Sequence, residues 1–91
     1  MAVEVRMPTI LRKYTAGEKA VAGSGGTVRE VIDDLEKKHP GVRGAVVAEG
    51  GELHRFINMY LNDEDIRFLG SLETPVSDGD VLSILPAVAG G

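Results

Sequence analysis

The sequence predicts an α+β fold in which a mixed sheet packs on one main helix. Three observations lead to this class. Segments near both ends of the chain alternate apolar and polar residues or run as short apolar stretches, as strands do. A single segment, around residue 30, repeats apolar residues at helical spacing. The length of 91 residues suits one domain with one modest core.

The chain begins with a predicted hairpin. Val3, Val5 and Met7 share one face of a strand whose opposite face is polar. A second short strand is expected around Lys19–Ala22, after a turn region that starts at "TILRKY". The two strands are therefore joined by a long connection.

The segment after "GSGG" is the clearest helix. Thr27 is the expected N-cap, and Glu30 three residues later completes a capping box. The apolar residues that follow form one stripe, made of Val28, Val31, Ile32 and Leu35. Acidic residues come early and basic residues late, which suits the helix dipole. Pro40 and Gly41 end the helix.

The second half of the chain supplies the other strands. Residues 42–54 leave two readings open, because their valines suit packing under the sheet while their glycines suit a loop. Residues 55–62 predict a strand with apolar residues on both faces, so it is expected to be central or covered. Residues 66–70 predict a short strand. Val81–Leu85 is the last strand, and Pro86, which has no N–H to donate, ends it.

The predicted order of elements is β-β-α-β-β-β. A hairpin, a helix and further strands place the first and last strands side by side and parallel, which is the grasp-type arrangement of small ubiquitin-like domains. We therefore expect a β-grasp domain over residues 1–86 and a flexible C-terminal tail over residues 87–91. The last, central strand delivers that tail past the edge of the sheet.

Composition excludes several classes of function. The net charge of −4 and the pI near 5.0 argue against nucleic-acid binding, which needs a basic surface. The chain has no cysteine, so disulfides, thiolate metal sites and cysteine nucleophiles are excluded. His39 and His54 lack metal-ligand spacing. No segment predicts a membrane span or a secretory signal, so a cytoplasmic protein is expected.

Three polar motifs favour turns over binding sites. Gly23–Gly26 precedes the helix, but it lacks the lysine and hydroxyl residue of a phosphate-binding loop, so a strand-to-helix connection is expected. Asn62–Asp65 lacks the pattern of a calcium loop. Ser77–Asp80 has the composition of a turn, with Gly79 free to take positive φ. No catalytic constellation is predicted, and the chain is not expected to be an enzyme.

The end of the sequence, "AVAGG", is the most distinctive stretch. Its small residues could thread a narrow channel in another protein, with a reach of about 17 Å over five residues. The α-carboxylate of Gly91 would be the reactive group. A frayed terminus explains the same stretch equally well when it is taken alone.

Taken with the strand before it, the tail resembles a known pattern. "DGDVLSILPAVAGG" is similar to the C-terminal end of the ThiS/MoaD family of ubiquitin-like sulfur carriers. In that comparison Asp78, Gly79 and Asp80 supply the turn, and Gly90 and Gly91 supply the end. Asn62 in "YLND" matches the asparagine that the family usually has before the next strand. The resemblance covers essentially the whole chain, most closely the cysteine-forming branch of the family.

The resemblance implies a chemistry for the tail. Gly91 would be the site of covalent attachment, and Gly90, Ala89, Val88 and Ala87 would thread into partner active sites. An adenylating enzyme of the ubiquitin-activating type would join Gly91 to AMP, using ATP and magnesium. A sulfur donor would then displace AMP and leave a thiocarboxylate.

The resemblance also implies the partners. In the cysteine-forming branch, a pyridoxal-phosphate cysteine synthase would use the sulfur with O-phosphoserine, and a zinc metalloprotease would release cysteine. This chain itself is expected to bind no cofactor and no metal, and to be monomeric alone. Nucleic acid and membranes are not expected partners.

A partner needs a docking surface beside the tail. Phe68 and Leu69 are the predicted docking residues. Ile57, Met59 and Leu61 are expected to be core residues instead, because alternate residues of a strand pack inward.

Other functions would use the same tail. The sulfur could serve thiamin, molybdopterin or secondary-metabolite synthesis. In a non-covalent alternative, the chain is a small accessory subunit, as in molybdopterin synthase, and its tail inserts into a larger subunit. Alternatively, the chain is a ubiquitin-like modifier that forms isopeptide bonds with lysines. The sequence leaves these alternatives open.

Overall fold

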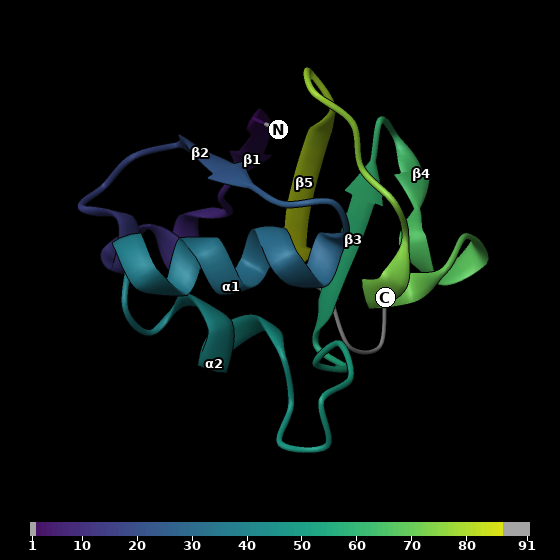
Figure 1. Ribbon diagram of the computed structural model, residues 1–91. Helices are drawn as coiled ribbons and strands as arrows, with labels where there is room; N and C mark the ends of the chain where they lie inside the picture. Colours follow the sequence, from purple (N-terminus) through teal and green to yellow (C-terminus); the bar gives the residue numbers. More distant parts are fainter. Residues whose placement is uncertain (1, 87–91) are drawn as a thin grey trace.

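The computed structural model describes residues 2–86, and Figure 1 shows one sheet with the main helix crossing one of its faces. The strands are β1 (Ala2–Arg6), β2 (Ala20–Ser24), β3 (Ile57–Leu61), β4 (Glu64–Asp65) and β5 (Val81–Pro86). The helices are α1 (Val28–Lys38) and α2 (Val42–Val46), with 3₁₀ helices η1 (Thr9–Thr15), η2 (Ile66–Phe68) and η3 (Ser71–Glu73).

The sheet has the order β2-β1-β5-β3-β4, in which the first and last strands are neighbours, as predicted. β1 pairs antiparallel with β2 and parallel with β5, so the first and last strands lie side by side at the centre. β5 also pairs antiparallel with β3. The last strand is therefore hydrogen-bonded on both sides, and it ends at Pro86.

Helix α1 begins as the sequence indicates. The Thr27 hydroxyl accepts a hydrogen bond from the Glu30 N–H at 3.2 Å. In a capping box, the Glu30 carboxylate would accept from the backbone N–H of the N-cap residue, Thr27. Here it accepts instead from the Gly26 N–H, one residue earlier, at 2.7 Å. The buried residues of the helix are the predicted stripe, Val28, Val31, Ile32 and Leu35.

The core lies between α1 and the inner face of the sheet, and its buried apolar side chains are all aliphatic or methionine. Ile57, Met59 and Leu61 are at most 8% exposed, which confirms them as core residues. β3 alternates buried and half-buried residues, so only one of its faces is fully covered.

The glycines before α1 allow a close approach of chain segments. A Cβ built on Gly23 would lie 2.7 Å from a Val31 side-chain carbon. One on Gly25 would lie 2.6 Å from the Cβ of Glu30 and 2.8 Å from the Val31 nitrogen. The connection therefore packs directly on the first turns of α1, which accounts for its glycines without a bound phosphate.

Side chains of α1 also cover the outer edge of β2. The Lys38 ammonium donates to the Ala22 carbonyl at 3.3 Å, and the Asp34 carboxylate accepts from the Ser24 N–H at 3.0 Å. Lys38 and Asp34 form an ion pair at 2.9 Å. Lys38 and the Ser24 N–H lower the pKa of Asp34.

The structure corrects one sequence-based prediction and decides between two readings of another segment. The predicted strand at residues 66–70 is wrong, because this segment begins with the 3₁₀ helix η2 and the adjacent strand β4 spans only two residues. Only Ile66 is buried there, and Phe68 is 85% exposed, so the segment lacks the burial pattern of a strand. In residues 42–54, the packing alternative is correct for Val42 and Val46, which are buried in α2.

Candidate functional site

The candidate site begins where β5 ends. Leu82 and Ile84 are buried and anchor the strand in the core, whereas Leu85 and Pro86 are exposed. Pro86 pairs in register with Ile57 and is the last residue that the structure describes at this end. The predicted attachment residue and threading residues, Ala87, Val88, Ala89, Gly90 and Gly91, lie outside the described residues.

The turn before β5 fixes the start of this strand. The Asp78 carboxylate accepts a hydrogen bond from the Ala2 N–H at 3.0 Å. Gly79 takes the predicted positive φ, 88°, and donates to the Ala2 carbonyl at 3.0 Å. The turn therefore holds the beginning of β1 as well as the beginning of β5.

Asp80 and Asn62 form a second clamp on β5. The Asp80 carboxylate accepts from the Ser77 N–H at 2.7 Å and from the Asn62 side-chain amide at 3.1 Å. These two donors lower the pKa of Asp80, the Ser77 N–H most strongly. Asn62 also accepts from the Val81 N–H at 3.0 Å, and its own N–H donates to the Val81 carbonyl at 2.8 Å.

Asn62 holds this position with φ of 51°, in the left-handed region that asparagine tolerates better than most residues. The Asp-Gly-Asp turn and this asparagine are thus one hydrogen-bonded unit around the beginning of β5. These hydrogen bonds hold β5, the strand that leads to the tail, in its register.

One side of the β5 end carries a groove of about 710 Å³ that sequence reasoning missed. It lies between η1 and the outer faces of β1, β3 and β5. Its lining includes the apolar residues Ile10 and Leu85, the aromatic Tyr60, Pro86, and three charged residues, Arg6, Arg12 and Asp63. Ile10 and Leu85 are 57% and 46% exposed, which is high for large aliphatic residues.

The predicted docking residues lie on the β4 side of the sheet. Phe68 and Leu69 are 85% and 43% exposed. The neighbouring Arg67 donates to the Ile57 carbonyl at 2.8 Å and to the Asn58 side chain, which ties this segment to the beginning of β3. The exposure agrees with a docking role for Phe68 and Leu69, and that role stays a prediction.

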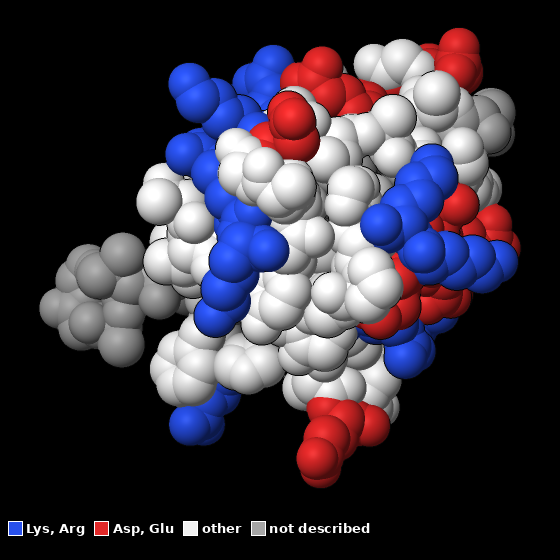
Figure 2. Space-filling model, turned by 90° about the vertical axis from the view of Figure 1, so that its left-hand side faces the viewer, with Lys and Arg blue, Asp and Glu red and all other residues white. Residues whose placement is uncertain are grey.

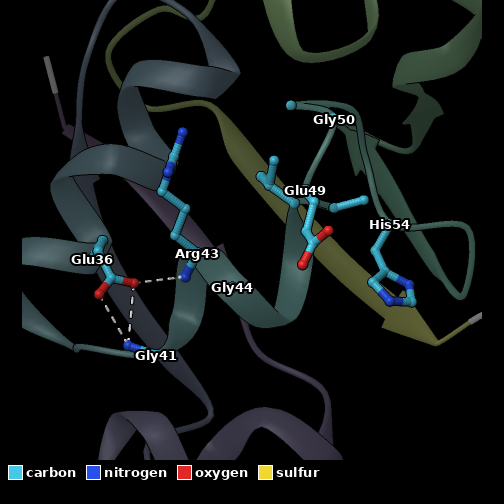
Figure 3. Close-up of a pocket in the computed structure, with 10 residues that line it drawn as sticks. Glu36, Gly41, Arg43, Gly44, Glu49, Gly50 and His54 are labelled. Atoms are coloured by element: carbon cyan, nitrogen blue, oxygen red, sulfur yellow. Dashed lines mark hydrogen bonds between the residues drawn. The ribbon is translucent and has the colours of Figure 1, made fainter.

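A larger hollow of about 970 Å³ lies beside α2, on another part of the surface (Figure 3). The Glu36 carboxylate in it accepts from the Gly41 N–H at 3.1 Å and from the Arg43 N–H at 2.9 Å, so it caps a chain turn. His54 uses its Nδ1 to accept from the Phe56 N–H at 3.2 Å. These polar groups serve the local fold.

Charges are unevenly distributed over the surface. On the side of the molecule seen in Figure 2, Lys and Arg side chains form a column across a largely uncharged area, and acidic side chains gather toward its margins.

Within residues 2–86, no group of three or more His, Asp or Glu side chains is placed to hold a metal ion. Over the same residues, no helix is long and apolar enough to cross a membrane.

A mixed sheet with parallel first and last strands, one covering helix and a central strand that ends at the surface defines a ubiquitin-like β-grasp protein. The chain belongs to the ThiS family, whose family model matches residues 5–91. Both the predicted fold class and the resemblance to ThiS/MoaD carriers are confirmed.

Relatives place the chain within this family. It is 52% identical over 93 residues to the sulfur carrier protein CysO of Mycobacterium tuberculosis, with both chains covered completely. The solved BexX/CysO complex of Amycolatopsis orientalis contains a chain that is 60% identical, with a TM-score of 0.92 over 99% of this chain and all of that one. The small archaeal modifier protein 3 of Haloferax volcanii is 31% identical, again over both whole chains.

Proposed function

We propose that this chain is a sulfur carrier and a co-substrate of other enzymes. The main support for this proposal is the 52% identity, over the full length, to a protein named as a sulfur carrier. The fold agrees with it, because the central strand β5 leads to the tail. Gly91 is the proposed attachment residue. The proposal requires that its carboxyl group is free.

The chemistry has two steps. A carboxylate is a poor electrophile, so an activating enzyme of the ubiquitin-activating type first joins the Gly91 carboxylate to AMP, with ATP and magnesium, and releases pyrophosphate. Sulfide, or a donor that delivers sulfur at the oxidation level of sulfide, then attacks the acyl carbon; the C–S bond forms as the bond to AMP breaks, and no oxidant or reductant is needed. The product is a thiocarboxylate, whose sulfur is the nucleophile for the next enzyme. Gly90, Ala89, Val88 and Ala87 are proposed to occupy the channel, because their small or compact side chains obstruct it little.

The proposed destination of the sulfur is cysteine. A pyridoxal-phosphate enzyme would combine the thiocarboxylate with O-phosphoserine, and a zinc metalloprotease would release cysteine from the tail. Resemblance to the CysO relatives supports this pathway over thiamin, molybdopterin or secondary-metabolite synthesis. The cofactors belong to these partner enzymes.

The test is intact-mass analysis after incubation with ATP, magnesium, the activating enzyme and a sulfur donor. We expect the mass to rise by the exchange of one oxygen for sulfur. Deletion of Gly91 should abolish the change. The matched control Gly50→Ala, at a remote glycine whose added Cβ meets nothing within 4 Å, should preserve it. Sulfur on the truncated chain, or none on the full chain, would refute the proposal.

A ubiquitin-like modifier is the second candidate, supported by the 31% identity to a small archaeal modifier protein. It predicts peptides in which Gly91 is joined to lysines of other proteins. Digestion and mass spectrometry of proteins from cells that make the chain distinguish the two functions. Thiocarboxylate without any such peptides favours the carrier.

A further inference from the structure

The turn before β5 contains the dipeptide of this chain that is most prone to rearrange by itself. Asp78 is the only aspartate or asparagine that is followed by glycine. At such a pair, the backbone nitrogen of the glycine can attack the side-chain carboxyl carbon, because glycine has no side chain to hinder the approach. The other aspartates, such as Asp80 before Val81, precede residues whose side chains obstruct this attack.

The reaction needs no reagent other than water. A new C–N bond joins the Gly79 nitrogen to the Asp78 carboxyl carbon, and a carboxyl oxygen leaves as water with the amide proton. The product is a five-membered succinimide, which hydrolysis opens by adding water back. Opening at the former side-chain carbonyl restores aspartate. Opening at the former backbone carbonyl produces isoaspartate, in which the chain runs through what was the side chain.

Steric hindrance does not protect this pair of residues. Asp78 and Gly79 are exposed, and a Cβ built on Gly79 would meet nothing within 4 Å. Protection comes instead from hydrogen bonds to Ala2, the first residue of β1. The Ala2 N–H donates to the Asp78 carboxylate at 3.0 Å, and the Gly79 N–H donates to the Ala2 carbonyl at 3.0 Å. The carboxyl group and the attacking nitrogen are therefore both held by Ala2.

Release of Ala2 requires only a local opening of the fold. Ala2 is exposed and lies at the end of its strand, where backbone hydrogen bonds open at less cost than in the core. Val3 and Val5, further along the same strand, are buried. The rest of β1 can therefore stay paired while its first residue detaches and frees the turn.

We propose that Asp78 is a site of isoaspartate formation and that the contact with Ala2 controls its rate. Isoaspartate inserts one extra backbone carbon between Ser77 and Asp80. The Ser77 N–H donates to the Asp80 carboxylate at 2.7 Å, and the Asp80 N–H donates to the Ser77 carbonyl at 3.0 Å. These bonds need a fixed separation, so the modified turn holds the beginning of β5 less firmly.

The test follows isoaspartate formation in the full chain, folded in neutral buffer and unfolded in urea. Trypsin releases residues 68–91 as one peptide, because no Lys or Arg follows Arg67. Liquid chromatography separates the isoaspartate form of this peptide, and fragmentation in the mass spectrometer assigns the modified residue. We expect the folded chain to form isoaspartate at residue 78 at least about 10-fold more slowly than the unfolded chain.

Two variants separate the release of Ala2 from unfolding of the whole chain. Ala2→Pro removes the N–H that binds Asp78, at a strand end where proline is tolerated. It should raise the rate in the folded chain about 5-fold. Thr27→Ala removes the N-cap bond of α1 and destabilises the whole fold by a similar amount, but it leaves both bonds to Ala2 intact. Its rate should equal that of the wild type. Urea unfolding measures the stability of both variants.

A second measurement needs no substitution. Urea promotes an opening in proportion to the surface that the opening exposes. Below the unfolding transition, it therefore favours global unfolding strongly and release of a single residue weakly. We expect the rate of isoaspartate formation in the wild type to be nearly independent of urea in this range. The purified isoaspartate form should unfold at a lower urea concentration than the original chain.

Several results would overturn the proposal. Equal rates in the folded and unfolded chains would show that Ala2 does not protect the turn. A rate that rises steeply with low urea, and rises equally in Ala2→Pro and Thr27→Ala, would make global unfolding the controlling step. Isoaspartate that forms mainly at Asp80, or at neither residue of the unfolded chain, would refute the site itself. None of these measurements depends on sulfur transfer, so the proposed function is tested separately.

Discussion

Gly25→Ala is expected to destabilise the chain strongly, although it adds only one methyl group. The added Cβ would lie 2.6 Å from the Glu30 Cβ, 2.8 Å from the Glu30 carbonyl carbon and 2.8 Å from the Val31 nitrogen. Two of these three atoms belong to the backbone of α1. They cannot rotate away as a side chain would, so the connection or the helix must move.

The magnitude follows from this contact. Overpacking typically costs about 1–3 kcal/mol of folding free energy. Because the contacts are with backbone atoms, we expect the loss for Gly25→Ala to lie at the upper end, about 3 kcal/mol. In a domain of this size, that lowers Tm by about 12–24 °C. Gly44→Ala is the matched control, because its Cβ meets nothing within 4 Å and the residue lies inside α2. It should stabilise the chain by about 0.5–1 kcal/mol.

Urea unfolding followed by circular dichroism measures both variants on the same scale, and it does not depend on tryptophan, which the chain lacks. The expected result is a pair of changes with opposite signs. A loss below about 1 kcal/mol for Gly25→Ala would show that the connection yields easily. The glycines would then need another explanation than close packing.

Three further predictions concern the strand that leads to the tail and the helix that covers it. Leu82→Ala empties a fully buried site in β5 and should cost about 2–5 kcal/mol in urea unfolding; a cost below about 1 kcal/mol would contradict its place in the core. Thr27→Ala removes the N-cap acceptor of α1 and should cost about 1 kcal/mol, whereas Thr27→Ser should restore most of it. The pKa of Asp80 is lower in the folded chain than in the unfolded chain, where it is about 4. The ionised carboxylate therefore contributes its full stabilisation of the fold above the unfolded-state pKa, and this stabilisation is lost as pH falls through the folded-state pKa. Asp80→Asn should therefore be less stable than wild type at neutral pH and converge with it in acid, and a difference that stays constant with pH would refute this.

Local patterns in the sequence predict most of the fold. The apolar stripe of α1 is visible at helical spacing, and the Thr27 cap precedes it directly. The alternation in β1 identifies its buried face, and the order of elements predicts that β1 and β5 are neighbours. These features depend on residues that are close in the chain or on general topology.

What the sequence did not predict depends on contacts between distant residues. The hydrogen bond between Asp78 and the Ala2 N–H spans 76 positions, and no local pattern announces it. The failure at residues 66–70 has the same origin, since "IRFLG" has strand-like composition but only Ile66 finds room in the core. Val42 and Val46, four residues apart, carried a helical signal for α2 that the surrounding glycines obscured.

The candidate site was predictable only where local sequence patterns mark it. The tail and the turn before β5 stand out as motifs. The groove beside the end of β5 does not, because Ile10 and Leu85 are brought together only by the parallel pairing of the strands beside them. Their exposure is a property of the folded chain, and nothing in their sequence neighbourhoods distinguishes them from core residues.

The cover over the β2 edge has a consequence for a protein of this kind. An open sheet edge offers N–H and C=O groups to strands of other chains and favours aggregation. Lys38 and Asp34 occupy two of these groups on β2. Removing both side chains, for example by Lys38→Ala with Asp34→Ala, would therefore expose a template for strand addition. The two side chains thereby limit strand pairing between β2 and other copies of this chain.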